Sequence, residues 1–127
     1  MAYKILIVDD SKLARMAVGK VLSGLRPNWT RVEATNADEA MALARQSSFD
    51  IALLDFNMPG RDGLSLAGDL REMSPEMPVA VISANVQHEV IQKANEVGAQ
   101  FLPKPLTEDA MRAFIDHAEQ RLETASR

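Results

Sequence analysis

The sequence predicts a single α/β domain with a doubly wound, five-stranded parallel sheet and helices on both faces, a (βα)5 arrangement. Short apolar runs of strand length recur along the chain. Longer stretches between them carry apolar residues every three or four positions, as amphipathic helices do. Strands that alternate with helices in this way form parallel sheets with right-handed crossovers.

Five runs are interpreted as strands. Three of them are almost wholly apolar, as in strands covered on both faces: residues 4–8 (KILIV), 51–55 (IALLD) and 78–83 (PVAVIS). Residues 30–35 (TRVEAT) alternate more between apolar and polar side chains, which predicts a less protected strand near an edge. Residues 100–102 (QFL) follow Gly98, a typical helix stop, and complete the set.

Five helical stretches follow these strands. Ser11 and Asn36 are predicted to cap the first two, and Asp62-Gly63 precedes the third. Each stretch has polar residues on one side and apolar residues on the other, so each can lie against a sheet. The residues expected on the apolar sides are, helix by helix, Leu13, Met16, Ala17, Val21 and Leu25; Ala37, Ala40, Met41 and Ala44; Leu64, Ala67 and Leu70; Val86, Val90, Ala94 and Val97; Leu106, Ala110, Phe114, Ala118 and Leu122.

Composition limits the classes of function. The 127 residues suit one domain, and a net charge of −4 argues against a general nucleic-acid or anionic-membrane surface. There is no cysteine, so disulfides, thiolate metal sites and thiol nucleophiles are excluded. The chain starts without a signal-peptide pattern, and no apolar run approaches the roughly 20 residues of a membrane span. A cytoplasmic protein is expected.

Polar side chains stand where four of the predicted strands end. Asp9 and Asp10 follow the first strand, and Asp55 ends the third. Ser83 ends the fourth strand and Lys104 follows the fifth. Because ligands of open α/β sheets bind outside the carboxyl ends of the strands, these side chains are expected to meet at one edge.

The chemistry of this set favours a metal and a phosphoryl group. Three converging carboxylates repel one another unless a cation neutralises them. Oxygen ligands prefer a hard cation, Mg²⁺ or Mn²⁺, to zinc. An ammonium and a hydroxyl would balance and bind phosphoryl oxygens, and a carboxylate is a competent nucleophile toward phosphorus. Each residue taken alone is more simply a solvated turn residue or a cap, so the joint occurrence carries the hypothesis.

Four motifs, in this order, resemble those of the receiver domain of two-component response regulators: ILIVDDS, DIALLDFNMPGRDG, PVAVISA and GAQFLPKP. The similarity extends from Lys4 to about Leu122. It implies a flavodoxin-like fold with strand order 2-1-3-4-5. It also implies that residues 1–127 are one receiver domain without an effector domain, either acting alone or as a fragment of a longer regulator.

The resemblance implies a role for each site residue. Asp55 would be the phosphoacceptor. Asp10, Asp55 and the backbone carbonyl of Asn57 would bind Mg²⁺ directly, and Asp9 would act on the metal largely through water. Lys104 would contact a phosphoryl oxygen of the modified acceptor.

The resemblance implies further roles for five residues. Ser83 would bond a second phosphoryl oxygen, and Phe101, where many relatives have tyrosine, would then change its packing. Pro105 resembles the family's cis proline, which holds the loop of the preceding lysine. Asn57 and Asn85 are expected to tune the lifetime of the aspartyl phosphate by shaping the access of water.

The expected function is a phosphorelay switch. A histidine kinase or phosphotransfer protein would donate a phosphoryl group from phosphohistidine to Asp55, and hydrolysis would reset the protein. Since it assists only its own modification, it is not expected to be an enzyme. An unnamed downstream protein would bind the surface of the fourth helix, fifth strand and fifth helix, where the candidate contact residues are Gln87, Gln92, Lys93, Arg112 and Asp116.

Three other functions compete with this one. A haloacid-dehalogenase-like phosphatase also uses a strand-end aspartate but needs Asp-x-Asp, whereas Ser11 stands two positions after Asp9. A nucleotide-binding enzyme is disfavoured because no glycine-rich phosphate loop follows the first strand. A receiver-like module that docks without phosphorylation usually lacks the acceptor, one of the acidic pair or the lysine, and this chain has all of them.

Overall fold

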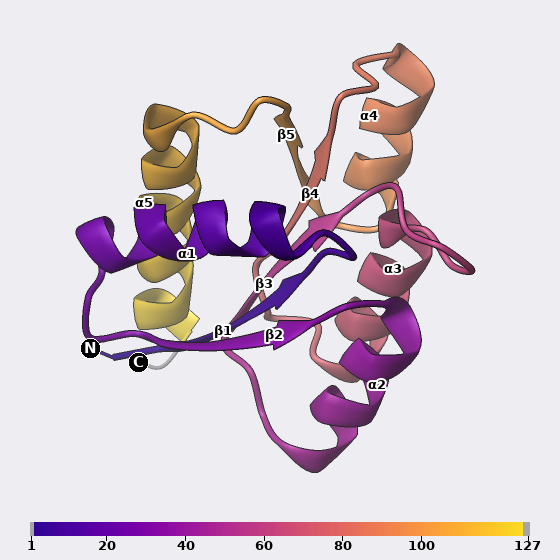
Figure 1. Ribbon diagram of the computed structural model, residues 1–127. Coiled ribbons are helices and arrows are strands. Elements are labelled where there is room, and N and C mark those ends of the chain that lie inside the picture. Colours follow the sequence, from indigo (N-terminus) through magenta and orange to yellow (C-terminus); the bar gives the residue numbers. More distant parts are fainter. Residues whose placement is uncertain (1, 126–127) are drawn as a thin grey trace.

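A computed structural model describes residues 2–125, in which strands and helices alternate along the chain (Figure 1). The strands are β1 (Lys4–Val8), β2 (Thr30–Ala34), β3 (Ile51–Asp55), β4 (Val79–Ser83) and β5 (Gln100–Pro103). The helices are α1 (Lys12–Leu25), α2 (Ala37–Gln46), α3 (Gly63–Met73), α4 (His88–Glu96) and α5 (Glu108–Ala125). None of the helices in this part of the chain has the length and apolar character needed to cross a membrane.

The strands form one parallel sheet in the order β2-β1-β3-β4-β5, as predicted. β1 lies inside the sheet, where Leu6 is opposite Val32 of β2 on one side and Ala52 of β3 on the other. β2 pairs only with β1 and is mostly exposed, which confirms the edge position predicted from its alternating pattern.

Alternate side chains of the strands enter two separate cores. Ile5 and Ile7 of β1 pack with residues of α1 and α5, whereas Leu6 and Val8 pack with residues of α2, α3 and α4. In Figure 1, α1 and α5 accordingly cover one face of the sheet and the other three helices cover the opposite face. Because both faces are buried, β3 and β4 are apolar at every position except the last, which is Asp55 in β3 and Ser83 in β4.

The predicted helix starts are confirmed by side-chain caps. Ser11, Asn36 and Asp62 accept hydrogen bonds from the backbone N–H groups three residues further on. Such bonds satisfy donors that have no partner within the helix. The Ser11 cap lies three residues after the end of β1, so it also fixes how the chain leaves the carboxyl edge of the sheet there.

The apolar face predicted for α1 is wrong in the N-terminal half of the helix. Leu13 is 79% exposed and Met16 is 58% exposed. The helix buries Leu22 fully and packs Val18 and Val21 partly against the core. The first two turns follow immediately on the end of β1, so they lie beside the carboxyl edge of the sheet rather than over its centre.

Two predicted helical positions precede their helices, and a third, Val97, follows the last residue of α4 as its C-cap. Val86 precedes α4 and is 60% exposed, because the helix begins only at His88. Leu106 precedes α5, whose start is capped by the hydroxyl of Thr107. Helical spacing can continue into a loop by chance, so periodicity alone does not locate the point where the backbone leaves the helix.

Gly63 allows α3 to approach the end of β3 closely. Its N–H donates to the carbonyl of Phe56 at 2.9 Å. A Cβ atom at this position would lie 2.3 Å from the carbonyl oxygen of Asp55, closer than any real contact. The loop from Asn57 to Asp62 is therefore closed at its base, and only glycine fits there.

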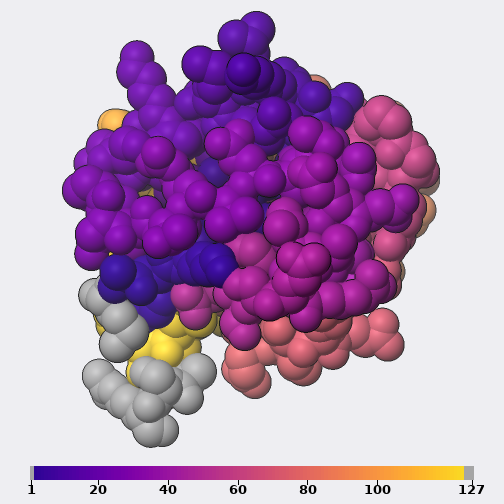
Figure 2. Space-filling view, turned by 60° about the horizontal axis from the view of Figure 1, so that its bottom comes forward, coloured from indigo at the N-terminus to yellow at the C-terminus, as the bar shows by residue number. Residues whose placement is uncertain are grey.

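The opposite end of the molecule joins α1 to α5. Figure 2 brings this end forward and shows it covered largely by α1, β2 and α2. Trp29 is buried there and packs edge-to-face on Tyr3 with ring centroids 5.5 Å apart. Arg26, at the end of α1, lies over the Trp29 ring and forms ion pairs of 2.6 Å with both Asp116 and Glu119 of α5.

Candidate functional site

Three carboxylates converge at the carboxyl edge of the sheet. One oxygen from each of Asp9, Asp10 and Asp55 lies within 4.8 Å of the others. Asp9 and Asp55 are buried, whereas Asp10 is exposed. Negative charges at this separation repel strongly, so the ionised cluster requires a cation or water.

The turn after β1 places both members of the acidic pair at the site. The Asp9 N–H donates to the Ala34 carbonyl at 3.1 Å and ends the β1–β2 ladder. Its carboxylate accepts the Ser11 N–H at 2.9 Å, which starts the turn into α1. Since the chain has left the strand, adjacent side chains no longer alternate between the faces of the sheet, and both carboxylates reach the same cluster.

The environment of Asp9 makes its carboxyl group harder to ionise than a free one, because it raises the pKa. Burial raises the pKa of this carboxyl group above its ordinary value, and the Asp55 and Asp10 carboxylates add to the effect. The Ser11 N–H and the Lys104 ammonium act in the opposite direction without cancelling it. A cation held among the three carboxylates would favour the ionised form.

Asp55 lies at the end of β3 with its side chain 4% exposed. The ammonium of Lys104 lies 2.7 Å from its Oδ1 atom. This contact is an ion pair that does not have hydrogen-bond geometry, and Oδ1 accepts no hydrogen bond from the described residues. The Asp55 Oδ1 atom therefore has a compensating positive charge beside it, that of Lys104, and still has free lone pairs.

Ser83 is buried at the end of β4, next to the strand that carries Asp55. Its hydroxyl oxygen accepts the Asn85 N–H at 2.9 Å. A hydroxyl that accepts one hydrogen bond can still donate a hydrogen bond to another group. The side-chain oxygen of Asn85 accepts the Gln87 N–H at 3.0 Å, so this amide is turned toward the start of α4.

The other predicted site residues lie around this centre. Asn57 is exposed in the loop after Asp55. Phe101 is partly buried on β5, opposite Val81, and packs against the core of α2, α3 and α4. The peptide bond before Pro105 is cis, and the N–H of the preceding lysine donates to the Ser83 carbonyl at 2.9 Å.

An apolar groove opens beside the acidic cluster and was not predicted. Its volume is about 590 Å³. It is lined by Asp9, Ala14, Ala17, Val18, Val21, Ile82, Ala84, Lys104, Pro105 and Leu106. The available signal was the apolar side of the first helix, which the sequence analysis assigned to the core instead.

Arg15 also lies beside the acidic pair and was not predicted. Its Nη1 donates to the Asp9 carbonyl at 2.7 Å, and its Nε donates to the Glu33 carboxylate at 2.8 Å. A bond from a guanidinium to a backbone carbonyl leaves no sequence motif. The available signal was an arginine one helical turn after the cap residue Ser11.

The donor set fits a hard divalent cation. All candidate side-chain ligands are carboxylate oxygens, which Mg²⁺ and Mn²⁺ prefer. The free lone pairs of the buried Asp55 Oδ1 and the exposed position of Asp10 leave both groups available as ligands.

Comparison with known proteins agrees with this geometry. The response regulator receiver domain family matches residues 5–116. Over 122 residues the chain is 34% identical to chemotaxis protein CheY-3 of Vibrio cholerae, covering 94% of this chain and 93% of that protein. Over 98 residues it is 39% identical to the glycerol metabolism activator of Pseudomonas putida, covering 76% of this chain and 44% of that protein.

Solved structures give the same result. Chemotaxis protein CheY4 of Vibrio cholerae superposes with a TM-score of 0.83 at 26% identity, covering 93% of this chain and 99% of that chain. NtrX of Brucella abortus superposes with a TM-score of 0.80 at 33% identity, covering 99% of this chain but 28% of that chain. The chain thus spans nearly all of some relatives and less than half of others. It belongs to the receiver domain family of response regulators, the phosphorylation-dependent switches of two-component signalling.

Proposed function

We propose that Asp55 accepts a phosphoryl group from the phosphohistidine of a histidine kinase or phosphotransfer protein, in a reaction that depends on Mg²⁺. The observation that carries the proposal is the buried Asp55 carboxylate, paired with Lys104 and adjacent to the Asp9 and Asp10 carboxylates. This combination provides a nucleophile in Asp55 and a positive charge for a phosphoryl oxygen in Lys104. It also provides a candidate metal-binding site, formed by the carboxylates of Asp9, Asp10 and Asp55 and called the metal seat below. The protein modifies its own side chain and is not an enzyme that acts on other molecules.

In the proposed reaction, a carboxylate oxygen of Asp55 forms a bond to phosphorus while the bond from phosphorus to the donor imidazole nitrogen breaks. Lys104 would contact one phosphoryl oxygen, and the Ser83 hydroxyl would donate a hydrogen bond to another. Mg²⁺, held by Asp10, Asp55 and the Asn57 carbonyl, would neutralise charge on the transferred group.

Hydrolysis of the aspartyl phosphate would reset the switch. Asn57 is exposed and Asn85 is partly buried, and each follows a residue of the centre by two positions. Side chains there shape the access of water to phosphorus. Substituting either residue is expected to change the dephosphorylation rate.

The phosphodonor partner is proposed to dock on the first half of α1 and the apolar groove beside it. The donor imidazole must reach Asp55, so its protein has to cover the mouth of the site. The groove reaches both Asp9 and Lys104, and Leu13 and Met16 present further exposed apolar surface on the same helix. Apolar surface in this position is best buried by the apolar side of a partner helix.

The output surface is proposed to be formed by α4, β5 and α5. Phosphorylation would engage Ser83 and shift the packing of Phe101, a residue of β5 that packs against the core of α2, α3 and α4. Asp116, one of the predicted contact residues, pairs with Arg26 at the end of α1, so its side chain lies on the side of α5 toward α1.

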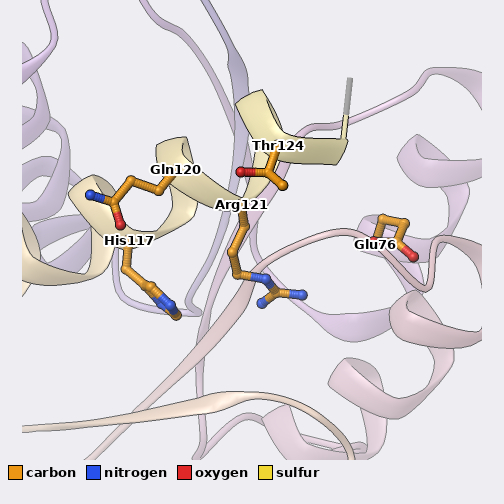
Figure 3. A pocket seen from close by; sticks show the side chains of 5 residues that line it. All are labelled: Glu76, His117, Gln120, Arg121 and Thr124. Atoms are coloured by element: carbon orange, nitrogen blue, oxygen red, sulfur yellow. The ribbon is translucent and has the colours of Figure 1, made fainter. Parts of the chain in front are cut away.

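The side of α5 that faces α4 and the start of β5 is lined by other residues. His117 and Arg121 extend from α5 together, with Glu76 across a hollow of about 340 Å³ (Figure 3). The same two side chains line an adjoining hollow of about 270 Å³ with Asn95 and Gln100. These four polar residues are better candidates for output contacts than Asp116.

Intact mass spectrometry after incubation with acetyl phosphate tests the proposal. One phosphoryl adduct is expected with Mg²⁺ and none without it. Asp55→Asn should abolish the adduct, whereas Asp69→Asn, which removes an exposed carboxylate paired with Arg61, should leave it unchanged. If a folded, Mg²⁺-binding protein accepts no phosphate from acetyl phosphate or from phosphohistidine proteins, the chain is a docking module that acts without phosphorylation.

A further inference from the structure

Arg15 holds the main chain of the acidic pair. Its Nη1 donates to the carbonyl of Asp9 at 2.7 Å, and that carbonyl belongs to the peptide group that joins Asp9 to Asp10. The Arg15 side chain is only 12% exposed. A bond to one atom of a rigid planar peptide restrains the whole plane, and with it the position of the next Cα atom.

The two carboxylates differ in how they are fixed. Asp9 is held by its own side chain, through the Ser11 N–H at 2.9 Å. Within the described residues, no hydrogen bond or ion pair holds the Asp10 carboxylate. Its placement therefore depends on the backbone, which the Arg15 side chain helps to restrain at the peptide group between Asp9 and Asp10.

We propose that Arg15 is a positioning residue for the metal seat, which it serves by fixing the peptide that presents the Asp10 carboxylate. The inference rests on the proposed function, because it assumes that this seat takes Mg²⁺. Arg15 does not contact any of the three carboxylates of the seat in this role. Instead, it binds the carbonyl oxygen of the peptide group that joins Asp9 to Asp10.

Glu33 keeps Arg15 in place. Its carboxylate accepts from Arg15 Nε at 2.8 Å while Nη1 of the same guanidinium donates to the Asp9 carbonyl. The planar guanidinium holds these two bonds at a fixed angle, which lysine cannot reproduce. Because Glu33 stands on the edge strand β2, the first loop of the site is anchored to β2 as well as to α1.

The charge of Arg15 and its proposed positioning role predict opposite changes in Mg²⁺ affinity when this side chain is removed. Loss of a positive charge near the site would by itself strengthen cation binding. Loss of the restraint on Asp10 would weaken cation binding, as removal of groups that orient metal ligands usually does, by about tenfold or more. The direction of the change in Mg²⁺ affinity therefore separates the two roles.

The test is a calorimetric Mg²⁺ titration of the full chain and its variants. Arg15→Met is expected to weaken binding by about tenfold. Arg15→Lys keeps the charge and should also weaken it, and Glu33→Gln should have a smaller effect in the same direction. The matched control is Arg31→Met, since Arg31 also joins β2 to α1 through a backbone carbonyl, that of Gly19 at 3.1 Å.

Folding is checked by circular dichroism on each variant. If folded Arg15→Met and Arg15→Lys proteins bind Mg²⁺ as tightly as wild type or the Arg31→Met control, the positioning role is wrong while the metal seat stands. If Arg15→Met does not fold, Arg15→Lys and Glu33→Gln decide by the same criterion. If the wild-type protein itself binds no Mg²⁺, both this inference and the proposed metal-dependent reaction are wrong.

Discussion

Helices α1 and α5 cover the same face of the sheet but bury very different surfaces. Helix α5 inserts four side chains that are at most 2% exposed: Met111, Phe114, Ile115 and Ala118. Helix α1 inserts only Leu22 to that extent and leaves Leu13 and Met16 exposed. The difference shows that two amphipathic helices on one face of a sheet can have different roles. Helix α5 stabilises the core, whereas α1 presents apolar side chains of its first turns beside the site.

The largest expected effect is on the α5 side of this comparison. Ile115→Ala removes a fully buried side chain and leaves a cavity, which should lower the free energy of unfolding by about 2–5 kcal/mol. Leu13→Ala in α1 should change it by less than about 0.5 kcal/mol. Urea unfolding followed by Trp29 fluorescence measures both, and equal losses would show that α1 is packed as tightly as α5.

The next effect concerns the acidic pair at the start of α1. Because the folded protein raises the pKa of Asp9, it binds more protons than the unfolded chain between the ordinary and the raised value. Stability of the metal-free protein should therefore fall as the pH rises through this window. Asp9→Asn should remove that part of the pH dependence and stabilise the metal-free protein at neutral pH. Urea titrations at mildly acidic and neutral pH test this, and an unchanged pH profile in the variant would contradict it.

A smaller effect is expected where the two helices are tied together. Arg26→Met removes both ion pairs to α5, one of which, with Glu119, is largely shielded from solvent, and should lower the free energy of unfolding by about 1 kcal/mol. Arg112→Met removes two exposed pairs within α5 and should cost about 0.3 kcal/mol. If thermal denaturation gives the same shift for both variants, the contact between the helices adds nothing beyond surface charge.

The smallest effect on stability should accompany a specific effect on signalling. Leu13→Ser should leave the free energy of unfolding within about 0.5 kcal/mol of wild type. It should slow phosphoryl transfer from a phosphohistidine protein, because the donor loses an apolar contact, and leave transfer from acetyl phosphate unchanged. Met73→Ser is the control, since Met73 is also exposed but lies at the end of α3. Equal slowing with both donors would place the defect in the site itself.

The sheet and the convergence of the acidic residues were predictable for a physical reason. Strands buried on both faces are apolar throughout, so the polar residues that end them mark the carboxyl edge. From there the meeting of Asp9, Asp10 and Asp55 followed from the parallel order of the strands alone.

The errors have a common cause. Periodicity identifies the apolar stripe of a helix but not the element that lies opposite it, so Leu13 and Met16 were assigned to the core. For the same reason it did not show that Asp116 lies on the side of α5 toward α1. Arg15 was missed because its partner is a backbone carbonyl, which every residue has.

The loop that follows Asp55 offers a place for an insertion. It is pinned at its base by the close approach of Gly63 to the end of β3, and its tip at Gly60 is exposed with a φ of 84°. Extra residues inserted in a closed loop add little entropic penalty, about 0.6 kcal/mol for each doubling of length. A short insertion beside Gly60 is therefore expected to leave the sheet intact, because the bond between Gly63 and Phe56 closes the loop at the end of β3.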